Sequence, residues 1–288
     1  MSLDLKTTEM SSCATDCNLD ETVRLGMPHL TACGLSMNWV LRECCHRQWW
    51  QIARHLDTDP ARLTDLAGAR MMASVVDVSV RGSLSAFRED DLLRIEPLVL
   101  ADPATGWRAK WMIRSAAGAS AMVELVTAFA KRTSDSNSSL SPAMLPAELK
   151  ADRSAPSSSG ARRLRARGKS IRAAAPGENA APLFSFEVFG PSHFNGVGLV
   201  YFANFVDFFE RAESLAIPDP MRTLTVTARS LHYFGNADHG DWIDIECGDT
   251  SCALTEGTEL TSFSVARRRS DGVVIAACMT SRGVSGKA

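Results

Sequence analysis

The fold of this chain is decided by one stretch of its second half, PSHFNGVGLVYFANFVDFFER (Pro191–Arg211). Gly196 and Gly198 permit a tight turn, because glycine tolerates backbone angles that other residues avoid. Aromatic residues then recur at helical spacing: Tyr201, Phe202, Phe205, Phe208 and Phe209. The pattern predicts a glycine turn followed by a largely buried helix over 200–215.

Polar groups with catalytic potential surround that turn. Free N–H groups at a helix start, here those of Gly198 and Leu199, can polarise a carbonyl oxygen on which negative charge develops. His193 carries an imidazole of suitable pKa and is the candidate general acid or base. The Asn195 amide is a candidate donor to a carbonyl or carboxylate. We therefore expect chemistry at the start of this helix.

Two residues of the helix extend the predicted site. Tyr201 is a candidate proton donor or acyl acceptor, and Glu210 is a candidate base if the helix turns it toward a cleft. Each candidate also has a structural interpretation. His193 can cap the helix, Asn195 can form the turn, Tyr201 can belong to the core, and Glu210 can face solvent.

Composition narrows the class of protein. The chain has 288 residues, 45% of them hydrophobic and 22% charged, and a formal net charge of −2. This predicts a soluble globular protein with room for two cores and no general attraction for nucleic acid or anionic membranes. We expect a cytoplasmic location, because neither a secretory signal nor a long apolar segment is present.

The eight cysteines are irregularly spaced, which favours reduced thiols over disulfides in a chain of this size. Cys13 and Cys17 are followed by no second pair at a zinc-site spacing, so we expect no metal. Nothing in the sequence requires a cofactor.

A change of composition divides the chain. Ser, Ala, Pro and Arg dominate 133–182, which predicts a flexible linker with a basic core at Arg162–Arg172. That core is either a solvated basic segment or a docking site for an acidic partner. The predicted organisation is a disordered tail (1–20), a first domain (21–132), the linker (133–182) and a second domain (183–288).

The flanking segments resemble repeats of one unit. Aligning His29 with His193, an offset of 164, also superposes Gly34 on Gly198 and Arg47 on Arg211. Each side is predicted to place one helix before four strands, over 37–56, 71–81, 92–100, 107–115 and 119–131 and again over 200–215, 223–233, 242–247, 251–266 and 272–282. This is an α+β fold in which an antiparallel sheet wraps a central helix, twice.

The segment LVYFANF (Leu199–Phe205) resembles the helix start of hot-dog thioesterases of the hydroxybenzoyl-CoA type. The resemblance implies a double hot dog, in which a fused pair of units replaces a homodimer and two sites are geometrically available. Asn195 stands where those thioesterases usually have a catalytic aspartate. An amide cannot act as nucleophile or general base near neutral pH, which argues against simple hydrolysis.

Motifs in the first half resemble a narrower group, the double hot-dog proteins of polyketide and nonribosomal biosynthesis related to the leinamycin-pathway acyltransferase/decarboxylase. They are GMPHL (Gly26–Leu30), GLSMNW (Gly34–Trp39) and SLSAFREDD (Ser83–Asp91). The resemblance implies acyl transfer from coenzyme A to a carrier protein through a tyrosyl ester. Here the segment that should hold the tyrosine reads Arg70-Met-Met-Ala73, so that step cannot be transferred.

The first half carries a corresponding polar set. His29, Asn38 and Glu43 form a second candidate site, and Arg88 is a candidate contact to a carrier's phosphopantetheine. Either Arg88 has this role or its segment is a charged turn before a strand.

These observations predict an enzyme of natural-product biosynthesis that processes an acyl thioester carried by coenzyme A or an acyl carrier protein. Acyl transfer, with or without decarboxylation, is the first hypothesis. A dehydratase or isomerase, a thioesterase, and a carrier-binding protein without catalysis are the alternatives. The fold also allows a homodimer.

Overall fold

The structure is a computed structural model that describes residues 22–101, 107–143, 158–177, 180–216, 224–248 and 259–283. The tail predicted over 1–20 lies outside these residues. Within them, no helix is long and apolar enough to cross a membrane.

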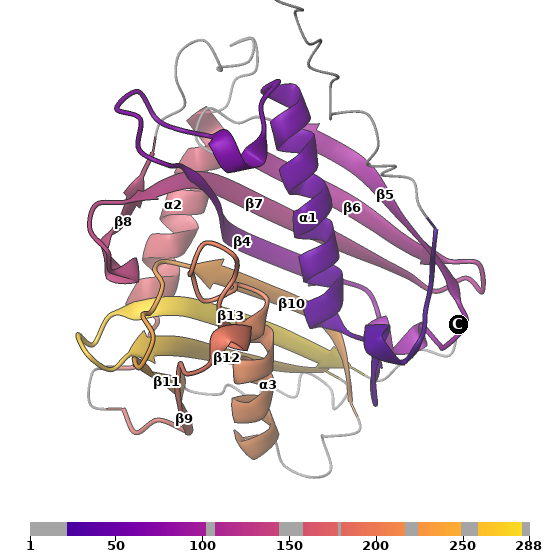
Figure 1. Ribbon diagram of the computed structural model, residues 1–288. Helices are drawn as coiled ribbons and strands as arrows, with labels where there is room; N and C mark the ends of the chain where they lie inside the picture. The colour runs from indigo at the N-terminus through magenta and orange to yellow at the C-terminus, as the bar shows by residue number, and fades with distance from the viewer. Residues whose placement is uncertain are drawn as a thin grey trace, which may run out of the picture.

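Both halves place one long helix before a run of four strands (Figure 1). The first contains β1 (Val23–Arg24), β2 (Leu30–Thr31), β3 (Gly34–Leu35), α1 (Met37–His55), β4 (Met72–Arg81), β5 (Leu92–Ala101), β6 (Trp107–Ser115), β7 (Ser120–Arg132) and β8 (Leu140–Pro142). Helix α2 (Ser158–Ala173) follows, and then β9 (Phe184–Glu187), α3 (Asn204–Ala216), β10 (Thr225–Tyr233), β11 (Trp242–Cys247), β12 (Glu259–Arg268) and β13 (Val274–Gly283). The predicted helices and strands are confirmed where the structure describes them, with shifts at their ends. The first part of the strand predicted over 251–266, residues 251–258, lies outside the described residues.

One antiparallel sheet runs through both halves in the order β1-β5-β6-β7-β4-β10-β13-β12-β11-β9. Strands β4 and β10 pair at its centre, with Ser79 opposite Ser230, so the two half-sheets are continuous. Helices α1 and α3 lie side by side on one face of the sheet (Figure 1). The chain therefore has the predicted α+β architecture of a double hot dog.

The core is shared between the halves. Val40 and Trp111 of the first half and Phe205 and Phe209 of the second belong to one buried cluster. Burial of these side chains removes apolar surface from water, which is the main stabilising contribution to folding. The apolar stripe predicted for the second helix is thus the surface that joins it to the sheet.

The start of each helix has a local cause. The Ser36 hydroxyl accepts a hydrogen bond from the Trp39 N–H and caps α1. Helix α3 begins at Asn204, later than predicted, because Asn236 accepts from the Val200 N–H at 2.8 Å and donates to the Val200 carbonyl at 3.1 Å. These bonds hold Val200 in an extended turn outside the helix.

The segment predicted as a flexible linker differs from that prediction where it is described. Residues 133–143 form a turn and strand β8, which pairs with β7, and Ser158–Ala173 form α2. Arg167 of α2 donates to Asp77 at 3.1 Å, and this contact between distant parts of the chain is invisible to local periodicity.

Gly34 provides a test of the packing at the first turn. Its φ is +108°, and a Cβ there would lie 2.6 Å from the Ser85 Cα and closer still to the Leu84 carbonyl oxygen. We expect Gly34→Ala to lower the free energy of unfolding by more than about 2 kcal/mol, measured by urea denaturation.

Gly118→Ala is the matched control, because Gly118 has φ +96° and no atom within 4 Å of the added Cβ. It carries the backbone strain without the clash, so it should cost about 1–2 kcal/mol. Equal losses for both variants would contradict the close approach at Gly34.

Candidate functional site

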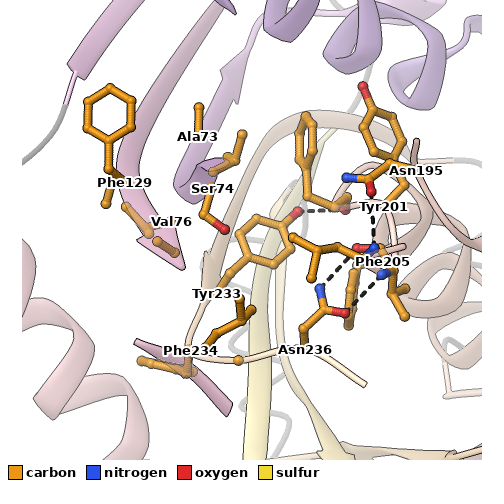
Figure 2. Close-up of a pocket in the computed structure, with 18 of the residues that line it drawn as sticks. Ala73, Ser74, Val76, Phe129, Asn195, Tyr201, Phe205, Tyr233, Phe234 and Asn236 are labelled. Atoms are coloured by element: carbon orange, nitrogen blue, oxygen red, sulfur yellow. Dashed lines mark hydrogen bonds between the residues drawn. The ribbon is translucent and has the colours of Figure 1, made fainter. Parts of the chain in front are cut away.

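The sheet opens beside its centre, and a cavity lies in the opening. Strand β10 pairs with β4 only over Asp77–Arg81, and β4 bulges between Val75 and Asp77. Beyond the bulge, a cavity of about 240 Å³, here the inner chamber, separates β4 from the second half (Figure 2). Its walls come from 45, 73–76, 128–130, 140–142, 195, 199–202, 205 and 233–236.

A second cavity of about 520 Å³, here the outer chamber, adjoins the first on the side of α1. Its lining includes His46, Trp49, Trp50 and Arg70. The two chambers share four lining residues: Cys45, Ala73, Asn195 and Tyr201. Together they form one inter-half cleft, with Asn195 and Tyr201 where the chambers meet.

Asn195 has a divided role. Its side-chain oxygen accepts from the N–H groups of Val197 and Leu199 at 3.1 and 3.0 Å and so holds the glycine turn. Its side-chain nitrogen has no hydrogen-bond partner among the described residues and points away from these N–H groups in Figure 2. The predicted turn-forming and donor roles are therefore compatible.

Tyr201 lies beside Asn195 at the same junction. Burial raises the pKa of its hydroxyl, and the opposing effect of Arg42 is smaller. The Arg42 guanidinium lies 4.8 Å from the ring centroid. The phenol consequently stays protonated at neutral pH and can donate a hydrogen bond, since its oxygen has no partner among the residues described.

The backbone donors predicted at Gly198 and Leu199 are engaged inside the turn. Gly198 N–H donates to the Asn195 carbonyl at 2.9 Å, and Leu199 N–H donates to the Asn195 side chain. A tight turn must satisfy its own N–H groups, so these two amides do not form the expected oxyanion site. In this region the donors that face the cleft are side chains.

His193 lies apart from the inter-half cleft. It lines a separate cavity of about 440 Å³ with Arg42, Asp207 and Arg211. Its Nδ1 is buried with no hydrogen-bond partner in the described chain, and its ring meets Phe208 edge-on at 6.0 Å. The structure thus separates His193 from Asn195, although they are two residues apart.

Glu210 belongs to another cavity, here the second cleft, of about 570 Å³. This cleft lies between the first-half turn and α3. Asn38 of α1 donates to Asp207 at 2.9 Å across it. Burial and the neighbouring Glu210 raise the pKa of Asp207. Asn38 and Glu210, predicted in different sites, therefore line one cleft.

The remaining first-half candidates do not line these clefts. Glu43 accepts from Arg47 at 2.9 Å on α1. His29 accepts the Gly26 N–H at 2.9 Å and meets Trp39 edge-on. Exposed Arg88 donates to the Ser85 and Phe87 carbonyls and holds its own turn.

Each cleft combines the turn of one half with the helix of the other. The outer chamber places α1 against Asn195–Val197, and the second cleft places α3 against Thr31–Leu35. Sequence reasoning missed this exchange and also three residues of the cleft walls: Trp49 and Trp50 in the outer chamber and Ser74 in the inner chamber. The resemblance to a fused pair of hot-dog units could have indicated this exchange, because paired hot-dog units build their sites between them.

An ion network fills the interior beside the second cleft. Arg229 and Glu213, 0% and 1% exposed, pair at 2.7 Å. Glu210 pairs with Arg229 at 2.5 Å, and Arg282 pairs with Glu213 at 2.7 Å. The second cleft therefore has a charged floor, whereas the inner chamber's described lining contains no charged side chain.

Among the described residues, no group of three His, Cys, Asp or Glu side chains lies close enough together to hold a metal ion.

Several solved structures resemble the whole chain. An acyl-ACP thioesterase from Bacteroides thetaiotaomicron is 10% identical, with a TM-score of 0.60 and coverage of 91% of this chain and 96% of its own. A Lactobacillus plantarum protein described as an oleoyl thioesterase is 11% identical, with a TM-score of 0.64 and coverage of 92% and 95%. A 12:0-ACP thioesterase from Umbellularia californica is 11% identical, with a TM-score of 0.57 and coverage of 90% and 95%.

These likenesses establish the double hot-dog fold. No family model and no curated protein matches the chain, so the narrower group suggested by the first-half motifs gains no support from these comparisons.

Removing the central cation tests the ion network. Arg229→Met removes one of the two cations that pair with the buried Glu213 and the cation that pairs with Glu210, and breaking a buried pair in this way costs about 3–5 kcal/mol. We expect that loss in the free energy of unfolding by chemical denaturation.

Arg24→Met is the control, because Arg24 pairs with Asp90 at the surface, where the two side chains are 65% and 81% exposed. It should leave the free energy of unfolding nearly unchanged, since exposed pairs contribute little. An equally small effect of Arg229→Met would contradict the role of the network.

Proposed function

We propose that this chain processes acyl thioesters and that the inter-half cleft is its active site. The observation that carries the proposal is the pair of neutral donors, the Asn195 amide and the Tyr201 hydroxyl, at the junction of an apolar chamber and a wider one. A thioester carbonyl at this junction meets both donors. The similarity of the fold to structures described as acyl-ACP thioesterases supports the substrate class.

The donors act on the charge that develops during reaction. In acyl transfer, an acceptor attacks the carbonyl carbon, the carbonyl oxygen becomes an oxyanion, and the thiolate then leaves. In decarboxylation of a malonyl-type thioester, the bond to the carboxylate breaks and its electron pair moves to the carbonyl oxygen as an enolate. Hydrogen bonds from preorganised donors stabilise either anion more than the ground state.

Acyl transfer, with or without decarboxylation, suits this cleft better than hydrolysis. Asn195 cannot serve as a base, and the described lining of the inner chamber contains no carboxylate. Asp59 lines the outer chamber but accepts the Ala61 N–H at 2.9 Å as a local cap. His46 is an exposed imidazole in the lining of the outer chamber, so these walls fit a reaction that needs donors at a carbonyl and no base inside the inner chamber.

The chambers also constrain the substrate. The inner chamber of about 240 Å³ is smaller than the roughly 300–1,000 Å³ that hold drug-sized ligands. It therefore suits a short acyl group, and the outer chamber suits the bulkier acceptor or carrier arm. Coenzyme A or phosphopantetheine is the carrier, and the first-half motifs support a role in polyketide or nonribosomal biosynthesis.

The second cleft supports a different candidate function. Asp207 and Glu210 face one cavity, Asn38 holds Asp207, and the pKa of Asp207 is raised by burial. A carboxyl group with a raised pKa and a second carboxyl group beside it can serve as acid and base for dehydration or isomerisation of a carrier-bound acyl chain. This function would leave Tyr201 without a role.

Two conservative variants test the donors. Tyr201→Phe removes one hydroxyl, and Asn195→Asp keeps the oxygen that holds the turn but removes the donor. We expect each to lower kcat for transfer from a short acyl-CoA to carrier-protein pantetheine by about 10²–10³, as for other oxyanion donors. Intact mass of the carrier is the measurement.

Unchanged thermal unfolding should accompany these losses, because neither variant removes a contact that holds the fold. Full activity of Tyr201→Phe and Asn195→Asp would exclude the inter-half cleft as the site.

Asp207→Asn separates the two candidate functions. It retains an oxygen for Asn38 and removes the titrating group of the second cleft. We expect acyl transfer by this variant at the rate of the unsubstituted protein. A loss of about 10² or more, the usual scale of general acid–base catalysis, would assign the chemistry to the second cleft.

A further inference from the structure

Helix α2 covers the face of the sheet opposite α1 and α3. At the centre of the sheet, Val78 and Leu231 belong to the core beneath the helices. Neighbouring residues in a strand alternate between faces, so Asp77 and His232 face the other way, and they bond to each other at 3.1 Å. Arg167 of α2 reaches Asp77 on that face.

The contact between α2 and the sheet is close. Gly168 is buried, and a Cβ at this position would lie 2.9 Å from the His232 Nε2. A glycine therefore allows the helix axis to approach the sheet at this point. The helix is attached to the sheet by this approach and by the Arg167–Asp77 ion pair.

The sequence of α2 is strongly basic. The helix sequence contains six cations, at positions 162, 163, 165, 167, 169 and 172, and no Asp or Glu. Positions 162, 165, 169 and 172 fall on one helix face, here the basic stripe, because they follow three- and four-residue steps. Lys169 and Arg172 are exposed. This concentration of charge contrasts with the chain's net charge of −2.

The basic stripe ends beside the inner chamber. The Arg172 guanidinium lies 4.3 Å from the centroid of the Phe234 ring, and Phe234 lines the chamber. In Figure 2, Phe234 and Val76 lie on the side of the chamber away from Asn195 and Tyr201. A ligand reaching the chamber past Phe234 would thus arrive from α2 and point toward the two donors.

We propose that the basic stripe of α2 is the docking surface for an acidic carrier protein, which delivers its acyl-pantetheine arm to the inner chamber past Phe234. The inference rests on the proposed function and adds the surface and direction of delivery. Positions 162 to 172 span about 15 Å of helix, ten steps of 1.5 Å each, and this length matches an acidic helix better than a compact phosphate. The helix sequence contains no aromatic residue for base stacking, which disfavours nucleic acid.

Charge reversal on the stripe tests the proposal. Arg165→Glu/Lys169→Glu changes two positions four residues apart and leaves the Arg167–Asp77 anchor intact. We expect the Kd for an acidic acyl carrier protein loaded with a butyryl group to rise about tenfold or more at low ionic strength, because complementary charge controls such association. The salt dependence of binding should weaken as well.

Arg94→Glu/Arg114→Glu is the matched control, with the same charge change on β5 and β6, where both side chains are largely exposed. It should leave carrier affinity unchanged. Butyryl-CoA turnover should be unchanged in both double variants, and a shared unfolding temperature would show that both fold.

Equal carrier affinity in the α2 variant and the unsubstituted protein would overturn the docking surface, as would equal losses in the two double variants. Tighter binding of single-stranded RNA than of the carrier protein would also overturn it. If butyryl-CoA and butyryl-carrier are both left unprocessed, the proposed function fails, whereas the binding measurement still decides the docking surface.

Discussion

The antiparallel pairing of β4 with β10 is the interaction on which the rest of the molecule depends. It makes one continuous sheet from two half-sheets and brings the helix of each half against the turn of the other. The pairing ends at Asp77, next to a bulge, and the strands separate beyond it. The inner chamber lies in this separation, so the same contact that joins the halves sets where their shared cleft begins.

Much of the fold was predictable because the local spacing of apolar residues indicates the helices and strands. The aromatic residues at helical spacing between Phe205 and Phe209 predicted α3, and runs of alternating or β-branched residues predicted the strands, since each pattern indicates which face of the element is buried. Helix α2 was not predictable in this way. Its contacts to the sheet use Gly168 and the Arg167–Asp77 ion pair, and neither produces an apolar stripe.

The candidate site was only partly predictable. Asn195 and Tyr201 do meet in one cleft, whereas His193 and Glu210 lie in two others. The pattern of one half holds no information about its contacts with the other, and Asn38 and Asp207 bond across 169 positions of sequence. Periodicity along a chain has no information about contacts between residues so far apart in sequence. The backbone N–H groups of Gly198 and Leu199, which the sequence predicts to be free, instead donate to Asn195 within the glycine turn.

The charged floor of the second cleft has a consequence for how a molecule of this kind can diversify. With the offset of 164, Glu213 of the buried ion network beside that cleft corresponds to Trp49 of the outer chamber, and Glu210 corresponds to His46. In a pair of identical subunits every substitution would appear in both clefts at once. Covalent fusion of the halves removes that symmetry, so one cleft can acquire ionic reinforcement while the other keeps aromatic walls and stays free to specialise.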